Sequence, residues 1–217
     1  MPIEDFDGNT FLAFLDISGF KEMMKNEKTA IKALNCFYKI GYSSLFNNVN
    51  INGFFISDSG LLFVRTSNLN LIEQLKEILK TIEIINRKLL EKNIMLTISI
   101  AYGEFKFQRH SEFMGISKNP IYGSAYVSAF LDNEKGKPKI QPGYCRLIIP
   151  DGNINFESNI NLLDNYYLSR LVKKRNHYYF YWMVNDGNKI KEFENLYNNS
   201  YHSKYTGMLS SLKKHIH

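Results

Sequence analysis

Apolar and polar positions follow clear periods along much of the chain, and these periods predict its main elements. Residues 11–15 are five consecutive apolar residues, which is typical of a strand buried on both faces, and we expect this strand to cover residues 11–17. The stretch 69–91 repeats apolar residues at intervals of three and four, which predicts an amphipathic helix with a packing role. Residues 94–103 alternate between apolar and polar and predict another strand.

The remaining elements follow from weaker patterns and from turn-forming residues. Two segments, 104–119 and 153–163, are expected to be loops. The other expected elements are helical segments over 20–48 with a break near Asn26 and Thr29, a hairpin over 51–65 that turns at 57–60, a helix over 121–133, a strand over 145–149, strands over 166–172 and 177–184 around a basic turn at 173–176, and a weak helical segment over 189–214.

This order of elements predicts one α+β domain. Strands and helices are mixed without the strict alternation of an α/β protein, so we expect one sheet with helices on one side. The sequence contains no internal repeat and no linker that would separate two units, so a single domain over residues 1–217 is expected.

The composition of the chain says more about its cellular compartment than about the reaction that it catalyses or the ligand that it binds. The formal charge of +6 and the pI near 9.1 suit a polyanionic ligand such as a nucleoside triphosphate or a nucleic acid, although a Lys- and Asn-rich composition produces the same charge without a ligand. The two cysteines, Cys36 and Cys145, are isolated, which indicates a reducing compartment. With no signal-peptide pattern and no apolar run of membrane-spanning length, we expect a soluble cytoplasmic protein without direct membrane insertion.

Two carboxylates are the candidate chemistry. Asp16 ends the buried strand, and Asp58 lies in the turn of the expected hairpin. If those strands pair, the two carboxylates meet, and they repel each other unless a cation lies between them. Oxygen ligands of this kind suit Mg²⁺ or Mn²⁺, which proteins often share with substrate phosphates. The alternative is that Asp16 only caps the following helix.

The Ser-Gly turn after Asp16 adds to this chemistry. Backbone N–H groups at Ser18 and Gly19 would open a helix, a position that favours phosphate, and the glycine permits close approach. The combination predicts metal-assisted phosphoryl transfer. The sequence has no GxxxxGK[ST], GxGxxG or GxSxG motif, and its five histidines show no zinc-binding spacing.

Four segments resemble the class III nucleotide cyclases, the adenylate and guanylate cyclase homology domains. They are the first metal motif at 14–20, the second metal motif at 57–61, the strand after the third helix at 99–103 and the start of the catalytic helix at 122–129. The resemblance covers roughly residues 10–185 as the core and leaves 186–217 as a C-terminal helical extension. It implies a ferredoxin-like sandwich with a mainly antiparallel sheet.

The resemblance also implies a mechanism. Asp16, Asp58 and the backbone carbonyl of Ile17 would hold two Mg²⁺ or Mn²⁺ ions, one activating the ribose 3′-hydroxyl and the other steadying the leaving pyrophosphate. The enzyme would work as a head-to-tail homodimer. Lys173 or Lys174 matches a family lysine that holds the triphosphate, although a solvated hairpin tip explains these lysines equally well. The implied substrate-binding residues are Ser18, Gly19, Phe20, Phe54, Tyr126, Lys139, Lys173 and Lys174.

The sequence departs from the purine cyclases at four positions. Phe54 and Pro120 replace the two residues that read a purine base, and neither can form a purine-specific pair of hydrogen bonds. Val127 and Leu131 replace the Asn and Arg of the catalytic helix. The domain is therefore either inactive or specific for another base.

A second resemblance favours another base. The pattern Gly123-x-Ala125-Tyr126-x-x-Ala129, followed by 137–140, resembles the pyrimidine cyclases of the Pycsar antiphage systems. That resemblance implies conversion of UTP to cyclic UMP, or of CTP to cyclic CMP, as an alarm signal for a downstream effector, with no nucleic-acid partner. Lys139 stands where that family tends to have Arg, which keeps the charge and loses bidentate phosphate geometry.

Two other functions stay open at this point. One is an inactive cyclase homology domain that dimerises and binds a nucleotide as a regulatory module. The other is a palm-type polymerase or cyclic dinucleotide synthase, which usually carries an acidic pair on the hairpin. Here Asp58 is flanked by Ser57 and Ser59, which argues against it.

Overall fold

The computed structural model describes residues 4–65, 68–112, 116–118, 120–149, 156–200 and 203–216. Its strands are β1 (Phe6–Ile17), β2 (Ile51–Ile56), β3 (Ser59–Val64), β4 (Leu96–Phe107), β5 (His110–Glu112), β6 (Ile116–Lys118), β7 (Ile121–Tyr122), β8 (Cys145–Ile148), β9 (Leu171–Lys174) and β10 (His177–Phe180). Its helices are α1 (Phe20–Met23), α2 (Glu27–Phe46), α3 (Leu71–Glu91), α4 (Ser124–Lys135), α5 (Phe156–Ile160), α6 (Asn165–Leu168), α7 (Ile190–Ser200) and α8 (Lys204–Ile216), with a 3₁₀ turn at Gly187–Lys189.

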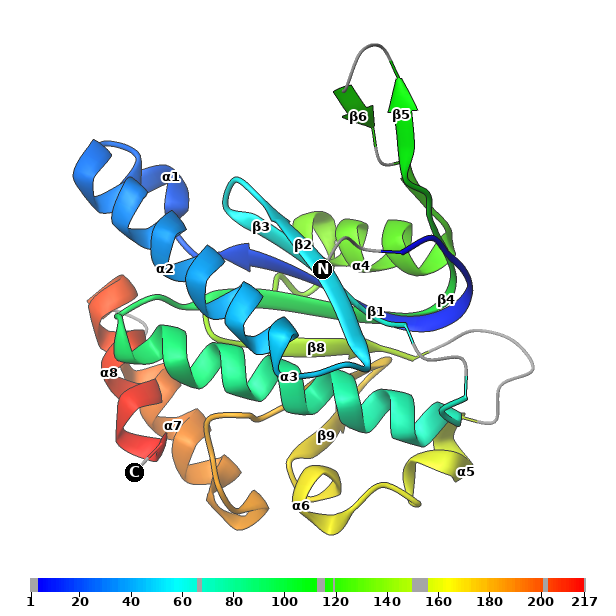
Figure 1. Ribbon diagram of the computed structural model, residues 1–217. Coiled ribbons are helices and arrows are strands. Elements are labelled where there is room, and N and C mark those ends of the chain that lie inside the picture. Colours follow the sequence, from blue (N-terminus) through cyan, green and yellow to red (C-terminus); the bar gives the residue numbers. More distant parts are fainter. Residues whose placement is uncertain are drawn as a thin grey trace.

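One large sheet forms the centre of the molecule (Figure 1). Its strand order is β2-β3-β1-β4-β8-β10-β9, and β7 pairs with the far end of β4. Only the β4–β8 pair is parallel among the described strands, so the expected mainly antiparallel α+β sheet is confirmed. Strand β1 lies between β3 and β4 and pairs with β4 along its whole length, from Phe6 to Ile17.

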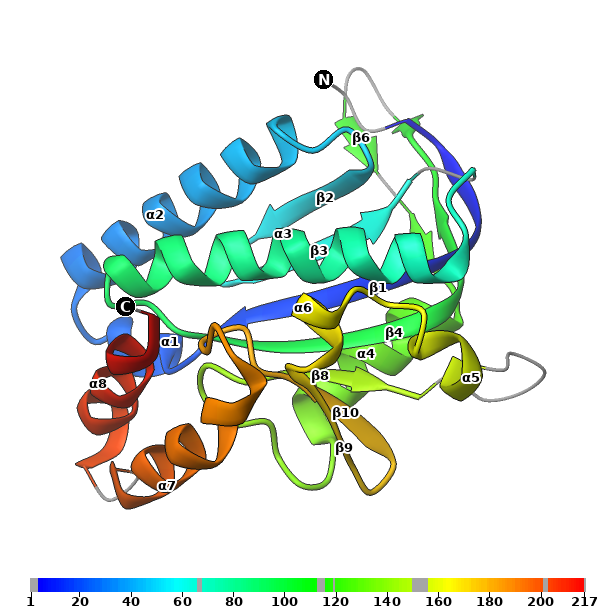
Figure 2. The same cartoon turned by 90° about the horizontal axis from the view of Figure 1, so that it is seen from below.

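Strand β1 is buried on both faces, as its unbroken apolar run predicts. Phe11, Ala13 and Leu15 belong to the core under α2 and α3, whereas Leu12 and Phe14 belong to a second core with α4. Figure 2 shows α2 and α3 on one side of the sheet and α4 on the other. Helices therefore cover both faces and not one, because a strand that is apolar on both faces needs cover on both.

The two long helices begin where the sequence provides caps. Asn26 separates α1 from α2, and its side chain accepts a hydrogen bond from the Thr29 backbone N–H at 3.1 Å. Asn70 begins α3 with a capping box, in which its side chain accepts from the Glu73 backbone and the Glu73 side chain accepts from the Asn70 backbone. These caps give the helices defined starts beside the sheet.

Three segments differ most from the expected elements, and two more are shorter than expected: the strand over 177–184 ends at Phe180, and β7 forms at the start of the helix expected over 121–133. Strand β4 continues to Phe107, into the segment 104–119 that was expected to be a loop, because Phe105 and Phe107 are buried in the second core. In the same segment, β5 and β6 form a separate two-stranded sheet. Helix α5 lies in the segment 153–163, of which 153–155 lie outside the described residues. The expected strand over 166–172 is instead α6 followed by β9, and the turn before β10 contains only Arg175 and Asn176.

The last two helices pack on the body of the domain. Trp182 is buried and donates its indole N–H to the Gly143 carbonyl at 2.7 Å, and Leu212 of α8 is wholly buried. Both cysteines are free thiols. Among the residues that the structure describes, no helix combines the length and apolar character needed to cross a membrane.

Candidate active site

The pairing of β1 with β3 brings the two predicted carboxylates together. Asp16 is opposite Ser59 in the register, and the Ile17 N–H donates to the Asp58 carbonyl at 2.9 Å. The Ser59 hydroxyl donates to the Asp16 carboxylate at 3.4 Å. The hairpin turn therefore carries Asp58 to the end of β1, as the sequence predicts if the two strands pair.

Burial and the charges near Asp16 shift the pKa of its carboxyl group. Burial, together with the negative charges of Asp58 and Glu134, raises the pKa of Asp16 to about 7. The hydrogen bond from Ser59 and the positive charge of Lys139 act in the opposite direction. Near neutral pH the carboxylate thus binds a proton readily, and a cation at this place would displace that proton.

The donor set fits a hard divalent cation. Asp16 and Asp58 carry carboxylate oxygens, the ligands that Mg²⁺ and Mn²⁺ prefer, and the backbone carbonyl of Ile17 directly follows Asp16 in the chain. No cluster of three or more His, Cys, Asp or Glu side chains with metal-binding geometry occurs among the described residues. A metal here would rely on two carboxylates, a backbone oxygen and oxygens from water or a substrate.

A buried ion pair fixes α4 and the loop that carries Lys139. Arg146 of β8 is wholly buried and donates from Nε and Nη2 to the Asp132 carboxylate at 2.9 and 2.7 Å. Its Nη1 donates to the Pro138 carbonyl at 2.6 Å, one residue before Lys139. The Ser99 hydroxyl also donates to Asp132, at 2.5 Å. This network ties the end of α4 and the following loop to the sheet beside Asp16.

The Ser-Gly turn is less suited to phosphate than the sequence predicts. The Ser18 N–H is taken by the Met95 carbonyl at 2.9 Å, and α1 has only four residues, so its dipole is small. Gly19 adopts a left-handed conformation with φ of 76°, and the Phe20 side chain is buried in the core. The Ser18 hydroxyl is buried without a hydrogen-bond partner among the described residues.

An aromatic cavity adjoins the carboxylates. It has a volume of about 250 Å³, and Ser59, the residue paired with Asp16, is one of its lining residues. Phe54 and Tyr126, both predicted to contact substrate, line it from β2 and α4. The rest of the lining is mainly apolar: Phe14, Ile56, Gly60, Leu61, Ile121 and Phe130.

No protein-family model matches the sequence, and the search of curated proteins finds no relative. Solved structures do match. The guanylyl cyclase Cya2 has a TM-score of 0.58 at 11% identity over 82% of this chain and 92% of that chain. The adenylyl cyclase CyaB from P. aeruginosa has a TM-score of 0.58 at 12% identity over 82% of this chain and 95% of that chain.

This chain has the class III cyclase fold. A third match is the guanylate cyclase domain of RhGC from Catenaria anguillulae, solved in complex with GTP, with a TM-score of 0.56 at 10% identity over 82% of this chain and 96% of that chain. These identities show a shared architecture, so the expected cyclase sandwich is confirmed as a fold.

Within one chain of this cyclase fold, the two predicted triphosphate lysines lie away from the carboxylates. Lys173 and Lys174 belong to β9, the edge strand, which is four strand positions from β1 and hence about 19 Å across the sheet. Lys173 pairs with Glu157, and Lys174 pairs with Glu194. The interpretation of these lysines as part of a basic turn is wrong, because both lie in the strand.

The outer surface of α4 carries the replacements of the cyclase Asn and Arg. Val127 and Leu131 are 49% and 44% exposed, and the neighbouring Phe130 is 37% exposed. Pro120 precedes β7 and accepts a hydrogen bond from the Gln108 N–H at 3.1 Å. An exposed apolar helix face is unusual on a monomer and suits an interface.

The sequence interpretation missed two groups of residues at this site. Glu134 and Ser59 act directly on the charge of Asp16, and Phe14 and Phe130 line the aromatic cavity. The sequence did contain a signal for Phe14, because Phe14 lies two residues before Asp16 and therefore on the same face of β1. No sequence pattern indicated Glu134, since only the packing of α4 across the sheet brings it near Asp16.

Proposed function

We propose that this protein is a pyrimidine nucleotide cyclase that converts UTP, or CTP, to the 3′,5′-cyclic monophosphate and pyrophosphate. The observation that carries the proposal is the convergence of Asp16 and Asp58 next to Ser59, which lines the aromatic cavity, within a cyclase fold. A pair of carboxylates that could bind a cation, beside a cavity for a base, supplies two parts that metal-assisted cyclisation of a nucleotide would use.

The chain's own residues would bind and orient the substrate. Phe54 and Tyr126 would hold the base in the aromatic cavity, and Lys139 would neutralise phosphate charge near Asp16. Asp16, Asp58 and the Ile17 carbonyl would hold two Mg²⁺ or Mn²⁺ ions. When bound, such ions lower the pKa of the ribose 3′-hydroxyl and stabilise the charge of the leaving pyrophosphate.

The preference for a pyrimidine rests on what the cavity lacks. The side chains of Phe54 and Pro120 offer no hydrogen-bond donor or acceptor where purine cyclases read the base. The cavity of about 250 Å³ is lined mainly by apolar residues, so it supports stacking of a small base more than reading of a purine edge.

We further propose that the active form is a homodimer with head-to-tail sites. The exposed apolar residues Val127, Phe130 and Leu131 of α4 would lie at the interface. A dimer would also allow Lys173 or Lys174 of one chain to approach the carboxylates of the other, although in each chain these lysines pair with glutamates.

A role in antiphage signalling follows from the resemblance to the Pycsar cyclases alone. On this proposal the protein works in the cytoplasm, and its cyclic nucleotide is the signal that an effector protein senses during phage infection. The mainly apolar lining of the aromatic cavity is compatible with such a pyrimidine product.

One observation favours a second candidate function, that of an inactive regulatory domain. Val127 and Leu131 cannot supply the hydrogen bonds that the Asn and Arg of active purine cyclases would supply. On this alternative the protein binds a nucleotide as a dimer without turning it over. The retained pair of Asp16 and Asp58 argues for the active enzyme.

Incubation of the protein with each of the four nucleoside triphosphates and Mn²⁺, followed by mass spectrometry of the products, tests the proposal. We expect cyclic UMP or cyclic CMP, and at least a 100-fold loss of rate in Asp16→Asn and Asp58→Asn, because each removes a metal ligand. A matched control is Asp7→Asn, a surface carboxylate on the same strand. Binding without any cyclic product would support the regulatory domain, and cyclic AMP or cyclic GMP as the main product would refute the pyrimidine preference.

A further inference from the structure

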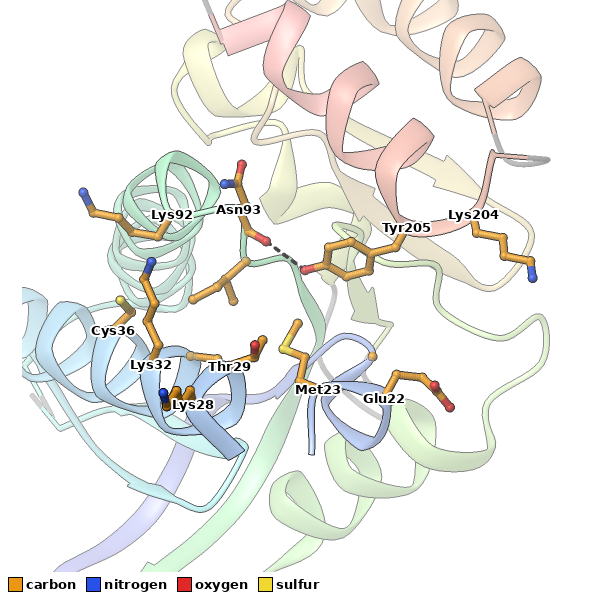
Figure 3. Close-up of a pocket in the computed structure, with 13 residues that line it drawn as sticks. Glu22, Met23, Lys28, Thr29, Lys32, Cys36, Lys92, Asn93, Lys204 and Tyr205 are labelled. Atoms are coloured by element: carbon orange, nitrogen blue, oxygen red, sulfur yellow. Dashed lines mark hydrogen bonds between the residues drawn. The ribbon is translucent and has the colours of Figure 1, made fainter. Parts of the chain in front are cut away.

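A second cavity is lined by Gly19 but by neither Asp16 nor Asp58, and it shares no lining residue with the aromatic cavity. It has a volume of about 770 Å³ and opens between α1, α2, the end of α3 and the start of α8 (Figure 3). Its lining is mainly apolar and includes Met23, Ala33, Cys36, Ile94 and Tyr205. The volume is typical of small-molecule sites in proteins, which are largely apolar with a few polar groups.

Unpaired cations surround this apolar lining. Lys28 and Lys32 of α2, Lys92 after α3 and Lys204 of α8 all line the cavity, and none of the four has a salt-bridge partner among the described residues. Glu22, the acidic residue among the described lining residues, is paired with Lys25 at 2.6 Å. The described lining residues therefore carry a net positive charge, and no ion pair among the described residues neutralises the four lysines.

The arrangement of the lysines concentrates this charge on one side. Lys28 and Lys32 are four residues apart on α2, a spacing at which like charges repel and an anion is stabilising. Figure 3 shows Lys32 extending from α2 toward the end of α3, where Lys92 lies, whereas Lys204 and Glu22 extend away to the other side. An anionic group would thus bind beside Lys28 and Lys32, with an apolar group against Met23 and Tyr205.

We propose that this cavity binds a small organic phosphate with an aromatic or apolar body, and that the ligand regulates the proposed active site. The binding part is independent of the proposed function, and the regulatory part rests on it. Lysines serve as point charges for phosphate, and the apolar lining supplies the contact area for the body of the ligand.

A short chain of hydrogen bonds connects the cavity to the candidate metal ligands. The Tyr205 hydroxyl accepts from the Met95 N–H at 3.2 Å and donates to the Asn93 carbonyl at 3.0 Å. The Met95 carbonyl in turn accepts from the Ser18 N–H at 2.9 Å, two residues after Asp16. The Tyr205 ring also packs against Gly19, where an added Cβ would lie 3.6 Å from it. A ligand that holds Tyr205 therefore also holds the segment after Asp16.

Calorimetric titration with 1-naphthyl phosphate, a simple aromatic phosphate, tests the site. We expect one binding event for the wild-type protein and at least a tenfold weaker one for Lys28→Gln/Lys32→Gln. Inorganic phosphate and 1-naphthol should each bind more weakly than the joined molecule. Lys80→Gln on the exposed side of α3 is the matched control and should bind as the wild type does. Equal affinity of wild type and double variant would overturn the site.

Cys36 offers a second measurement that needs no mutation. Cys36 lines the cavity and is partly exposed, whereas Cys145 is wholly buried, and burial raises the pKa of its thiol. A disulfide reagent such as DTNB should therefore react at Cys36 in the folded protein. Saturating 1-naphthyl phosphate should slow this reaction at least fivefold in the wild type and not in Lys28→Gln/Lys32→Gln. Unchanged reactivity of Cys36 in the wild type would contradict binding in this cavity.

The regulatory part is tested by Mn²⁺ binding, which does not depend on turnover. We expect 1-naphthyl phosphate to change the Mn²⁺ dissociation constant of the wild type at least threefold. Tyr205→Phe keeps the ring and removes the hydroxyl, so it should still bind 1-naphthyl phosphate but lose the effect on Mn²⁺. An unchanged Mn²⁺ affinity in the wild type would refute the regulation, whereas absence of cyclic products would refute only the proposed enzyme.

Discussion

Asp16 is held in a setting that disfavours its charge. Its side chain is partly buried at the end of β1, with Asp58 and Glu134 near it, and its pKa is raised to about 7 from the ordinary value of 3.8. Ser59 and Lys139 favour the ionised form, but their effect is smaller than the opposing one. The folded protein therefore stores an unfavourable interaction at neutral pH, which a bound cation would turn into a favourable one.

This shift has a defined consequence for stability. Between pH 4 and pH 7 the folded state holds more protons at Asp16 than the unfolded state, so the free energy of unfolding falls as pH rises through this window and levels off above it. We expect Asp16→Asn to stabilise the metal-free protein by about 1–3 kcal/mol at pH 8, and by much less near pH 4, after allowance for solvent screening. Urea unfolding at both pH values measures this, and equal effects at the two values would contradict the shift.

Mn²⁺ should offset the free-energy cost of ionising Asp16 in the folded protein, because it binds the ionised carboxylates. We expect Mn²⁺ to raise the melting temperature of the wild type more at pH 8 than at pH 5.5, because Asp16 must lose its proton to bind the ion. Asp16→Asn should lose most of this effect. A stabilisation that is the same in the wild type and the variant would show that Mn²⁺ binds elsewhere.

The buried ion pair of Arg146 and Asp132 is a second feature whose contribution to stability can be measured. Arg146→Met keeps the volume of the side chain but leaves the Asp132 carboxylate without its partner, so we expect a loss of about 3–5 kcal/mol. The control is Lys106→Met, which breaks an ion pair with Asp7 at 2.9 Å on the surface and should cost less than about 1 kcal/mol. Denaturant unfolding separates the two, and similar losses would refute a special role for the buried pair.

At the scale of elements, long apolar patterns were predictive and short mixed ones were not. The apolar run before Asp16 and the period of three and four over 69–91 predicted β1 and α3, since both patterns are set by burial in a large core. The aromatic stretch at 166–172 was predicted as a strand. It forms α6 and the start of β9 instead, and Arg170, which lies between these two elements, is buried and donates two hydrogen bonds to Glu83 of α3 at 2.9 and 3.0 Å. No local pattern reveals such a distant partner.

The residues of the candidate site also fall into two groups, those that the sequence could predict and those that it could not. Asp16 and Asp58 could be predicted to meet, because a hairpin next to a strand fixes the register of both. The position of α4 on the opposite face of the sheet could not be predicted from the sequence. The contributions of Glu134 and Phe130 to the site therefore could not be predicted either. Residues that act across layers of a fold leave little trace in the sequence of either layer.

Helix α8 depends on a close contact at Gly143. Gly143 has φ of +85°, and an added Cβ would lie 2.5 Å from Leu212, which is wholly buried. We expect Gly143→Ala to destabilise the protein by about 1–3 kcal/mol and to expose α8 to proteases, because the side chain strains the backbone and displaces Leu212. Gly8→Ala, where the nearest atom would be 3.8 Å away, is the control and should be near neutral. Limited proteolysis with unfolding measurements tests this, and a stable, protease-resistant Gly143→Ala would contradict it.

At the scale of the whole molecule, the sheet separates the site from the lysines that the cyclase resemblance assigns to it. Strand β9 lies at one edge, while β1 and the hairpin of Asp58 lie toward the other. A single chain thus holds the proposed metal ligands and the aromatic cavity apart from Lys173 and Lys174. This division is the physical reason to expect a dimer.

We expect Val127→Glu/Leu131→Glu to convert the proposed dimer to monomers and to abolish most cyclase activity. Two charges on the exposed apolar face of α4 would be costly to bury in an interface. Light scattering after size-exclusion chromatography gives the oligomeric state. The control is Leu162→Glu, an exposed apolar residue outside α4, which should stay dimeric. A wild type that is monomeric while it makes a cyclic product would refute the dimer.

The hydrogen bonds of Tyr205 have a consequence for when the protein becomes competent during synthesis. Strand β1 leaves the ribosome early, whereas α8, which holds the end of β1 through Met95 and Ser18, is translated only after β10, the last strand of the large sheet. A growing polypeptide that has not yet formed α8 lacks the hydrogen bonds that hold the residues after Asp16. The proposed metal site therefore gains this support later in synthesis than the strands that carry Asp16 and Asp58.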